Sequence, residues 1–348
     1  MHSIFRQRRI STHAMTLAAA VMLAACDQSG QKASTNAAPD AAKSGAGSAA
    51  TRQSTTGKAA RIVIKPQFDE ADTFSAGLAA VRVGGKYGYI DKQGTIVIKP
   101  QFDFAGTFSE GLAAVGIGSK DGYIDMQGRF VITPPFDVAD LFAFSEGLAA
   151  VRIGDFLNGK WGYIDKQGQI VIKPQFESAG SFSDGIAVVA IDGKWGYIDS
   201  RGQFLIKPQF ASAGSFSDGL ASVRVGDFLT GKNGYIDKQG KFAINPQFDA
   251  AFPFRDGLAD VSTGDKYGFI DKQGKFAIAP QFDFADSFSD GLAAIRMGDD
   301  NSGKQAYIDK QGKIVIEPQF DQIGAFSEGL APVRMGDDKT GKWGYIGR

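Results

Sequence analysis

The fold of this chain is decided by the stretch Gly-Lys-Trp-Gly-Tyr-Ile-Asp-Lys-Gln-Gly-Gln-Ile-Val-Ile-Lys-Pro-Gln-Phe, residues 159–176. Its Tyr-Ile pair predicts a short strand, its Asp-Lys-Gln-Gly a tight turn, and its Gln-Ile-Val-Ile the returning strand of a β-hairpin. In such a turn the aspartate accepts hydrogen bonds from nearby backbone N–H groups and the glycine takes positive φ. Because proline has no N–H for the ladder, we expect Pro174 to end the second strand.

The same unit occurs eight times between residues 61 and 348. Its Pro-Gln-Phe triplet, Pro-Pro-Phe in one copy, recurs at offsets of 34 to 40 residues, which indicates a tandem repeat. The triplets begin at Pro66, Pro100, Pro134, Pro174, Pro208, Pro246, Pro280 and Pro318. After each triplet we expect an irregular stretch and then a third strand, clearest in Ala79-Ala-Val-Arg-Val83. The length differences fall mainly in the link from this strand to the next unit, as a surface loop tolerates.

The blocks Lys-Trp-Gly-Tyr-Ile at Lys160, Lys194 and Lys342, together with a recurring Phe-Ser-Asp/Glu-Gly-Leu-Ala, resemble bacterial WG-repeat proteins. The resemblance covers the whole of 61–348. Some copies depart from the motif: Tyr87, Asp121, Asn233, Tyr267 and Gln305 stand in the Trp position, and Ala306 in one Gly position. The resemblance implies an all-β repeat scaffold, usually outside the cytoplasm, without a common catalytic activity, cofactor or set of functional residues.

The fold class that we expect is all-β, with eight tandem repeats of about three short antiparallel strands. The first unit starts at its returning strand, Arg61-Ile-Val-Ile-Lys65, and the last stops after Trp343-Gly-Tyr-Ile346, so each end supplies what the other lacks. This favours a closed, propeller-like ring or a strongly curved β array, which leaves no sheet edge open. An open β-superhelix or solenoid is the alternative.

Two phenylalanines per unit are present in all eight copies, and we predict that they form the core. If each ring buries about 200 Å², the sixteen rings contribute roughly 80 kcal/mol of gross burial. An open row of such rings would aggregate in water. They are Phe68, Phe102, Phe136, Phe176, Phe210, Phe248, Phe282 and Phe320, and Phe74, Phe108, Phe144, Phe182, Phe216, Phe254, Phe288 and Phe326.

The first 25 residues have the three-part layout of a secretory signal peptide. Arg6, Arg8 and Arg9 form the positive region, 14–23 is apolar, and Leu-Ala-Ala-Cys closes the segment at Cys26. This tetrapeptide resembles the lipobox of bacterial lipoproteins. The resemblance implies cleavage before Cys26 and attachment of three acyl chains, palmitate among them, to that residue. The alternative is an ordinary secretory signal with a chance cysteine.

Residues 26–60 comprise the predicted lipidated Cys26 and a tether of Ala, Ser, Gly, Thr, Lys and Gln without an aromatic residue, Ile, Leu or Val. Such a segment buries too little apolar area to offset its ordering entropy, so we expect it to be flexible. The predicted location is the bacterial cell envelope, anchored in the lipid bilayer. In the enteric version of the lipoprotein family Asp27 favours the periplasmic face of the inner membrane, and the outer membrane is expected otherwise.

The scarce residue types limit the chemistry of the repeat domain. Lys and Arg number 38 and Asp and Glu also 38, a balance that argues against nucleic-acid binding. His2, His13 and Cys26 are the only histidines and cysteine, so the repeats lack His- and Cys-based nucleophiles and the usual ligands of zinc and haem. The repeated acids indicate turn chemistry rather than calcium binding or catalysis. We therefore predict no catalytic, cofactor or metal residue and a protein that is not an enzyme.

Residues that depart from the repeat point to function better than those that recur. Phe156-Leu157 and Phe228-Leu229 lie in lengthened links. They either pack onto the neighbouring unit or serve as anchors for a partner. The hypothesis is a membrane-anchored, non-enzymatic scaffold that binds another envelope protein through them. The alternative is binding of cell-wall glycan or polysaccharide, or its carboxylate-only hydrolysis, which an exposed aromatic flanked by two carboxylates about 5–9 Å apart would favour.

Overall fold

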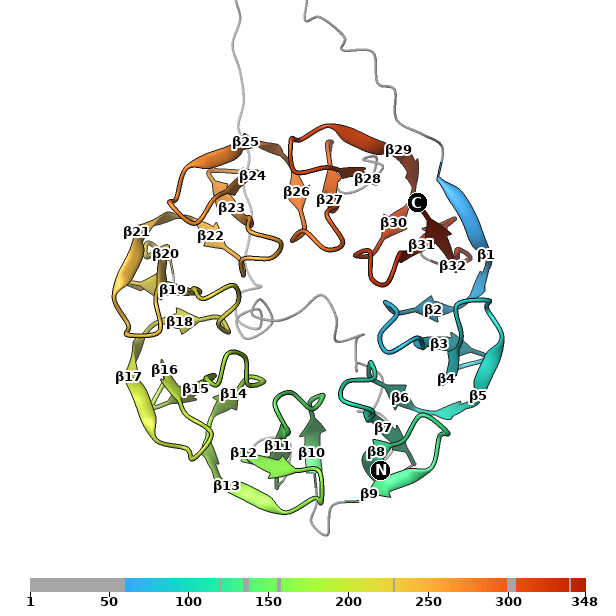
Figure 1. The fold of residues 1–348 in the computed structure, drawn as a ribbon, viewed down its shortest axis with the longest axis horizontal. Helices are drawn as coiled ribbons and strands as arrows, with labels where there is room; N and C mark the ends of the chain where they lie inside the picture. The colour runs from blue at the N-terminus through green and yellow to red at the C-terminus, as the bar shows by residue number, and fades with distance from the viewer. Residues whose placement is uncertain are drawn as a thin grey trace, which may run out of the picture.

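Eight four-stranded antiparallel sheets form the blades of a closed β-propeller (Figure 1). This computed structural model describes residues 60–118, 120–133, 138–154, 158–227, 229–298, 305–337 and 339–348, with the side chains of 138–141 left out. All regular elements in these ranges are strands, and no helix there has the length and hydropathy to cross a membrane. The predicted signal peptide, Cys26 and the tether up to residue 59 lie outside the described residues.

From the axis outward, and in chain order of the blades, the strands have the following bounds. The first three blades are β2 (Glu70–Ala71), β3 (Ala79–Val83), β4 (Lys86–Ile90) and β5 (Ile96–Phe102); β6 (Phe104–Ala105), β7 (Ala113–Ile117), β8 (Lys120–Ile124) and β9 (Phe130–Ile132); and β10 (Val138–Leu141), β11 (Leu148–Ile153), β12 (Lys160–Asp165) and β13 (Ile170–Phe176). The fourth to sixth blades are β14 (Ser178–Ala179), β15 (Ala187–Ile191), β16 (Lys194–Ile198) and β17 (Phe204–Phe210); β18 (Ser212–Ala213), β19 (Ala221–Val225), β20 (Lys232–Ile236) and β21 (Phe242–Phe248); and β22 (Ala250–Ala251), β23 (Ala259–Thr263), β24 (Lys266–Ile270) and β25 (Phe276–Phe282). The seventh and eighth blades are β26 (Phe284–Ala285), β27 (Ala293–Arg296), β28 (Gln305–Ile308) and β29 (Ile314–Phe320); and β30 (Gln322–Ile323), β31 (Leu330–Met335), β32 (Lys342–Gly347) and β1 (Arg61–Phe68).

Each blade contains a fourth strand that the sequence did not predict. It is the short strand nearest the axis, such as β14, and it lies in the stretch after Pro-Gln-Phe that we expected to be irregular (Figure 1). In β14 only Ser178 and Ala179 pair with β15. Two residues are too few to leave a period in the sequence, so this strand is decided by its neighbour in the blade.

The ring is closed by strands from the two ends of the described chain. In the eighth blade β1 pairs antiparallel with β32, so that blue and red strands lie side by side in Figure 1. The Ser327 hydroxyl donates to the Phe74 carbonyl at 2.6 Å across this junction, as Ser75 does to Phe108 at 2.7 Å between the first two blades. The expected closed ring is confirmed, and the open superhelix is not formed.

The hydrophobic core lies between neighbouring blades. One cluster joins Tyr345 of the eighth blade to Phe74 and Val81 of the first. The ring centroids of Tyr345 and Phe74 are 4.9 Å apart. Fifteen of the sixteen recurrent phenylalanines are described, and each exposes 6% or less of its surface. Phe136 lies outside the described residues. The predicted phenylalanine core is therefore confirmed where the structure describes it.

The prediction that Pro174 ends its strand is wrong, because β13 continues through it to Phe176. β13 is the perimeter strand of its blade, so only one of its edges needs hydrogen-bond partners. Its pairing shifts between Ile172 and Phe176, and Pro174 lies in the bulge that results. A proline without an N–H disturbs no ladder bond at such a place.

The same bulge explains the glycine of the Trp-Gly pair. At Gly344 an added Cβ would lie 2.5 Å from the Ile64 carbonyl oxygen and 2.6 Å from the Pro66 nitrogen of the perimeter strand. Contacts of 2.4–2.6 Å to the equivalent carbonyl occur at Gly88, Gly122, Gly162, Gly196, Gly234 and Gly268. The backbone of the perimeter strand thus passes over a position where a side chain would have to displace it. In the seventh blade the buried Ala306 takes this place.

We predict that Gly344→Ala lowers the free energy of unfolding by about 2 kcal/mol, because the new methyl group pushes β1 away from β32. Urea denaturation followed by tryptophan fluorescence would measure it. The matched control is Ala306→Gly, which acts at the same position of the seventh blade without adding an atom. A Gly344→Ala protein as stable as the unmodified one would contradict this account of the close approach.

Candidate functional site

The propeller has two faces that differ in their loops. The links between the second and third strands of each blade and the segments that lead into the next blade lie on one face, which we call the link face. The hairpin turns and the loops between the first and second strands lie on the opposite face, the turn face. The alternation follows from antiparallel pairing, since successive connections leave opposite ends of a sheet.

On the link face, Leu229 is 87% exposed. It lies in the link between β19 and β20 of the fifth blade. The Asp227 carboxylate accepts hydrogen bonds from the Leu229 amide at 2.8 Å and from the Thr230 amide at 2.7 Å, so the backbone of the link is held in a turn. Leu229 therefore extends into solvent and does not pack onto a neighbouring unit. Phe156, Leu157 and Phe228, the other predicted anchors, lie outside the described residues.

The link of the eighth blade uses the same turn with polar residues. There the Asp337 carboxylate accepts from the amides of Lys339 at 2.9 Å and Thr340 at 2.7 Å. Lys339 occupies the place of Leu229. The turn thus needs its aspartate but not an apolar tip, and nothing in the local backbone accounts for the leucine.

A cavity of about 470 Å³ adjoins the Leu229 link, between the fourth and fifth blades. Its wall combines two phenylalanine rings with an ammonium group and a carboxylate. It is lined by Lys194, Gln209, Phe210, Ala211, Val225, Gly226, Asp227 and Phe242.

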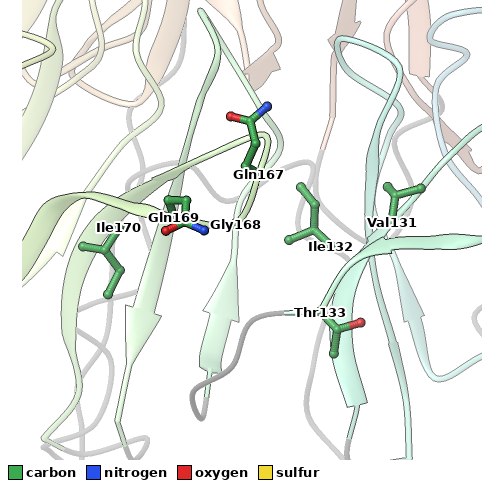
Figure 2. Close-up of a pocket in the computed structure, with 7 residues that line it drawn as sticks. All are labelled: Val131, Ile132, Thr133, Gln167, Gly168, Gln169 and Ile170. Carbon is green, nitrogen blue, oxygen red and sulfur yellow. The ribbon is translucent and has the colours of Figure 1, made fainter.

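A second cavity, of about 610 Å³, lies on the perimeter between the second and third blades (Figure 2). Val131, Ile132 and Thr133 come from the end of the second blade's perimeter strand, and the opposite wall is the hairpin turn at 167–170. These lining side chains are apolar or carry only a hydroxyl or an amide. They offer no group that titrates near neutral pH, so we assign this cavity no chemistry.

The repeated acids have two structural roles. In the hairpin turn, the Asp199 carboxylate accepts from the amides of Arg201 and Gln203, both at 2.9 Å, which is the turn chemistry predicted from the sequence. The acids before the glycine do more than shape a turn, because Glu146 of the third blade accepts from the Gly185 amide of the fourth at 2.9 Å. Sequence reasoning missed this bond between blades.

These bridging acids also meet the turn lysines. Lys166 of the third blade lies 3.0 Å from the Glu110 carboxylate of the second. Burial by itself raises the pKa of Glu110. The hydrogen bonds from Lys166 and from the Gly147 amide outweigh it and hold that pKa below its usual value. The carboxylate is therefore ionised at neutral pH and tied to the neighbouring blade.

Asp260 is the acid that stands apart from the repeat. It takes a place on the second strand where other blades have alanine, valine, serine or proline, and it is 1% exposed. The Ser287 hydroxyl of the next blade donates to it at 2.8 Å. Burial raises the pKa of the Asp260 carboxyl to about 7; the Ser287 bond and Arg255 oppose this shift, and Asp286 adds to it. Its position as the sole acid in that column of the repeat was the signal that could have identified it.

The nearby charge of Asp286 is the acidic group that adds to the raised pKa of Asp260. Because Asp260 is closed to solvent, it cannot reach a substrate in this conformation, and we assign it no catalytic role. Among the described residues no three His, Cys, Asp or Glu side chains are grouped as a metal site requires.

The structure thus defines a class of protein, the eight-bladed β-propeller built from tandem repeats. A family model described as "WG containing repeat" matches the chain at residues 58–87, 87–120, 122–155, 161–195, 195–227, 234–267, 267–299 and 306–343. The chain belongs to this WG-repeat family. No curated protein matches it.

Solved structures share the fold at low sequence identity. The chain is similar to a eukaryotic initiation factor, with 10% identity, a TM-score of 0.50, and coverage of 74% of this chain and 89% of that one. Hsv2p of Kluyveromyces lactis matches with 9% identity, a TM-score of 0.47, and coverage of 82% and 98%. PorZ of Porphyromonas gingivalis, a surface component of the type-IX secretion system, matches with 12% identity, a TM-score of 0.41, and coverage of 80% and 42%. The first of these likenesses supports the propeller fold and nothing further.

We predict that the stability of the protein falls as pH rises from about 4 to 7 through Asp260. Its folded-state pKa of about 7 lies above the usual 3.8, so the folded state binds the proton more tightly and loses this advantage as the carboxyl ionises. Asp260→Ala should raise the free energy of unfolding at pH 8 by about 1–3 kcal/mol and have little or a negative effect at pH 4.

Urea denaturation at both pH values would measure the difference. The control is Ser222→Ala, which removes a buried hydroxyl at the same place in the fifth blade and should have an effect independent of pH. Parallel pH profiles for the unmodified protein and Asp260→Ala would show that Asp260 does not titrate in this range.

Proposed function

We propose that this protein is a membrane-anchored, non-enzymatic scaffold of the bacterial cell envelope that binds another protein through its link face. The observation that carries the proposal is Leu229, an apolar side chain that is 87% exposed at the tip of a hydrogen-bonded turn. The equivalent turn in the eighth blade is built without such a residue. The leucine is therefore explained better by a partner than by the fold.

The energetics suit an anchor of this kind. Full burial of a leucine side chain is worth about 1.5–3 kcal/mol. Because the Asp227 carboxylate already orders the backbone of the link, binding loses less conformational entropy there than at a flexible loop. A preformed apolar tip on a rigid ring therefore gives much of its burial energy to affinity.

Four of the links between the second and third strands are longer than the rest, and two of these four carry the same Phe-Leu pair. In the sequence they lie between the second and third strands of the third and fifth blades, as Phe156-Leu157 and Phe228-Leu229. Of these four residues, Leu229 belongs to the part of the chain that the structure describes. The fourth blade between them has a short link, Asp192-Gly193. A partner that engages both pairs would span the fourth blade, and its affinity would gain from two contacts on one rigid frame.

The anchor in this proposal rests on the sequence around Cys26. Three acyl chains, at about 0.8 kcal/mol for each buried methylene group, would hold the protein in the bilayer for its lifetime. The tether that follows would let the propeller meet a partner at some distance from the membrane. Asp27 favours the inner membrane in this scheme.

The proposed anchor predicts that Cys26→Ser moves the protein from the membrane fraction to the soluble extract, since no acyl chain can then be attached. Metabolic labelling with an alkyne analogue of palmitate should mark the unmodified protein and not the variant. Asp27→Ser keeps the cysteine and serves as the control that stays in a membrane fraction. Retention of Cys26→Ser in the membrane without label would contradict lipidation as the anchor.

Photo-crosslinking in the native envelope tests the binding face. A photoreactive residue at Leu229 should give an adduct with a defined protein, whereas the same residue at Lys339, the equivalent tip of the eighth blade, should not. Mass spectrometry identifies the adduct. Adducts with glycan alone would favour the polysaccharide alternative, and equal adducts from both sites would contradict a specific role for the Leu229 link.

A further inference from the structure

On the link face an acidic side chain joins neighbouring blades at most junctions, and we call this contact the carboxylate lock. The residue after the Pro-Gln-Phe triplet is usually an acid, and one of its oxygens accepts from a glycine amide in the link of the blade that follows. In the sixth blade Gly264 donates to Asp249 at 2.8 Å, and Lys232 of the fifth blade forms an ion pair with the same carboxylate. The acid therefore joins a backbone amide and an ammonium group.

The lock recurs around the ring. The glycine-to-carboxylate bonds are Gly84 to Asp69, Gly118 to Asp103, Gly193 to Glu177, Gly264 to Asp249, Gly298 to Asp283 and Gly336 to Asp321. The ion pairs across blades are Lys86 with Asp103, Lys232 with Asp249, Lys266 with Asp283 and Lys342 with Asp69. The arrangement is therefore a property of the repeat.

Ala211 breaks this lock between the fourth and fifth blades. It is the one copy in which a residue without a carboxylate follows the triplet. Both donors are nevertheless retained, Lys194 in the fourth blade and the Gly226 amide in the fifth. Within the part of the chain that the structure describes, neither makes the bond that its counterparts make to the acid. An ammonium group and an amide N–H are thus left facing the position of a carboxylate.

These two donors line the cavity of about 470 Å³ beside the Leu229 link. Phe210 and Phe242 supply its apolar wall. The Asp227 carboxylate also lines the cavity, but its oxygens accept from the amides of Leu229 and Thr230 and from the Thr230 hydroxyl at 2.5 Å, so it is engaged within its own turn. The site therefore combines apolar surface, one ammonium group and an amide that has no acceptor among the described residues, while the carboxylate that lines it is engaged in its own turn.

We propose that this cavity binds a carboxylate side chain of a partner protein, which takes the place that Asp249 and its counterparts hold in other blades. The two donors suit the two oxygens of a carboxylate, because the same pair grips Asp249 in the next blade. Phe210 and Phe242 favour an acidic residue that is flanked by apolar residues, and Leu229 lies on the same link. The inference rests on the proposed scaffold function and specifies the chemistry of its partner.

Peptide binding to the mature full-length protein in detergent micelles tests this assignment. The probes are fluorescein-labelled peptides with the core Leu-Glu-Phe or Leu-Gln-Phe, followed by fluorescence anisotropy. The glutamate peptide should bind about tenfold or more tightly than the glutamine peptide, since a charge-assisted pair is lost in the latter. Equal affinity of the two peptides would overturn the proposal.

Two variants and a matched control localise the effect. Ala211→Asp supplies the missing carboxylate from the chain itself, so it should remove the preference for glutamate while leaving the thermal stability equal or higher. Lys194→Gln should remove the same preference. Lys232→Gln, which alters a lysine already paired with Asp249, should leave it intact. An unchanged preference in Ala211→Asp would overturn the site.

Competition by sodium acetate separates a general anion site from a peptide site. Acetate should displace the glutamate peptide only at a concentration far above that of an unlabelled Leu-Glu-Phe peptide. Displacement at equal concentrations would overturn the assignment to a protein side chain.

The failure of this inference and that of the proposed function can be told apart. A Leu229 adduct that persists at full yield in Ala211→Asp would leave the scaffold standing and remove the carboxylate site from it. A preference for the glutamate peptide without any protein adduct at Leu229 would support the carboxylate site and contradict the proposed scaffold function.

Discussion

The pairing of β1 with β32 is the constraint on which the rest of this molecule depends. A blade of four short strands cannot bury its own faces, and the core clusters lie between one blade and the next. Closure gives the eighth blade its perimeter strand and covers Tyr345 with Phe74 of the first blade. Without it two blade faces would be open to water, as at the exposed end of any repeat array.

Closure also makes the blades comparable, and this comparison separates the residues that every junction needs from those that depart from the repeat. The glycine under the perimeter strand, the acid that reaches the next blade and the carboxylate lock recur because each junction must satisfy the same contacts. Ala211, Asp260 and Leu229 satisfy none of these requirements. Two of them, Ala211 and Leu229, belong to one side of the link face, where a missing carboxylate and an exposed leucine adjoin the same cavity region.

Much of the fold could be predicted from the sequence, because the period repeats eight times and local chemistry is strong. The phenylalanine core and the hairpin turn at Asp165–Gly168 follow from apolar patterning and turn preferences. The complementary end units favoured a closed ring over an open superhelix, and the pairing of β1 with β32 decided between them. The strand β14 and the passage of β13 through Pro174 do not follow from such patterns. Both depend on what lies beside the strand. β14 is held by its pairing with β15, and β13 can pass through Pro174 because its outer edge is unpaired.

The sequence by itself determined the number of repeats, the all-β class, the identity of the core rings and the links that depart from the pattern. Only the tertiary structure decided that Leu229 is exposed, that Asp260 is buried against Ser287, and that Ala211, Lys194 and Gly226 line one cavity. The physical reason is the same in each case. Burial and hydrogen bonding across blades join residues that lie tens of positions apart, and no local periodicity records which donor will face which acceptor.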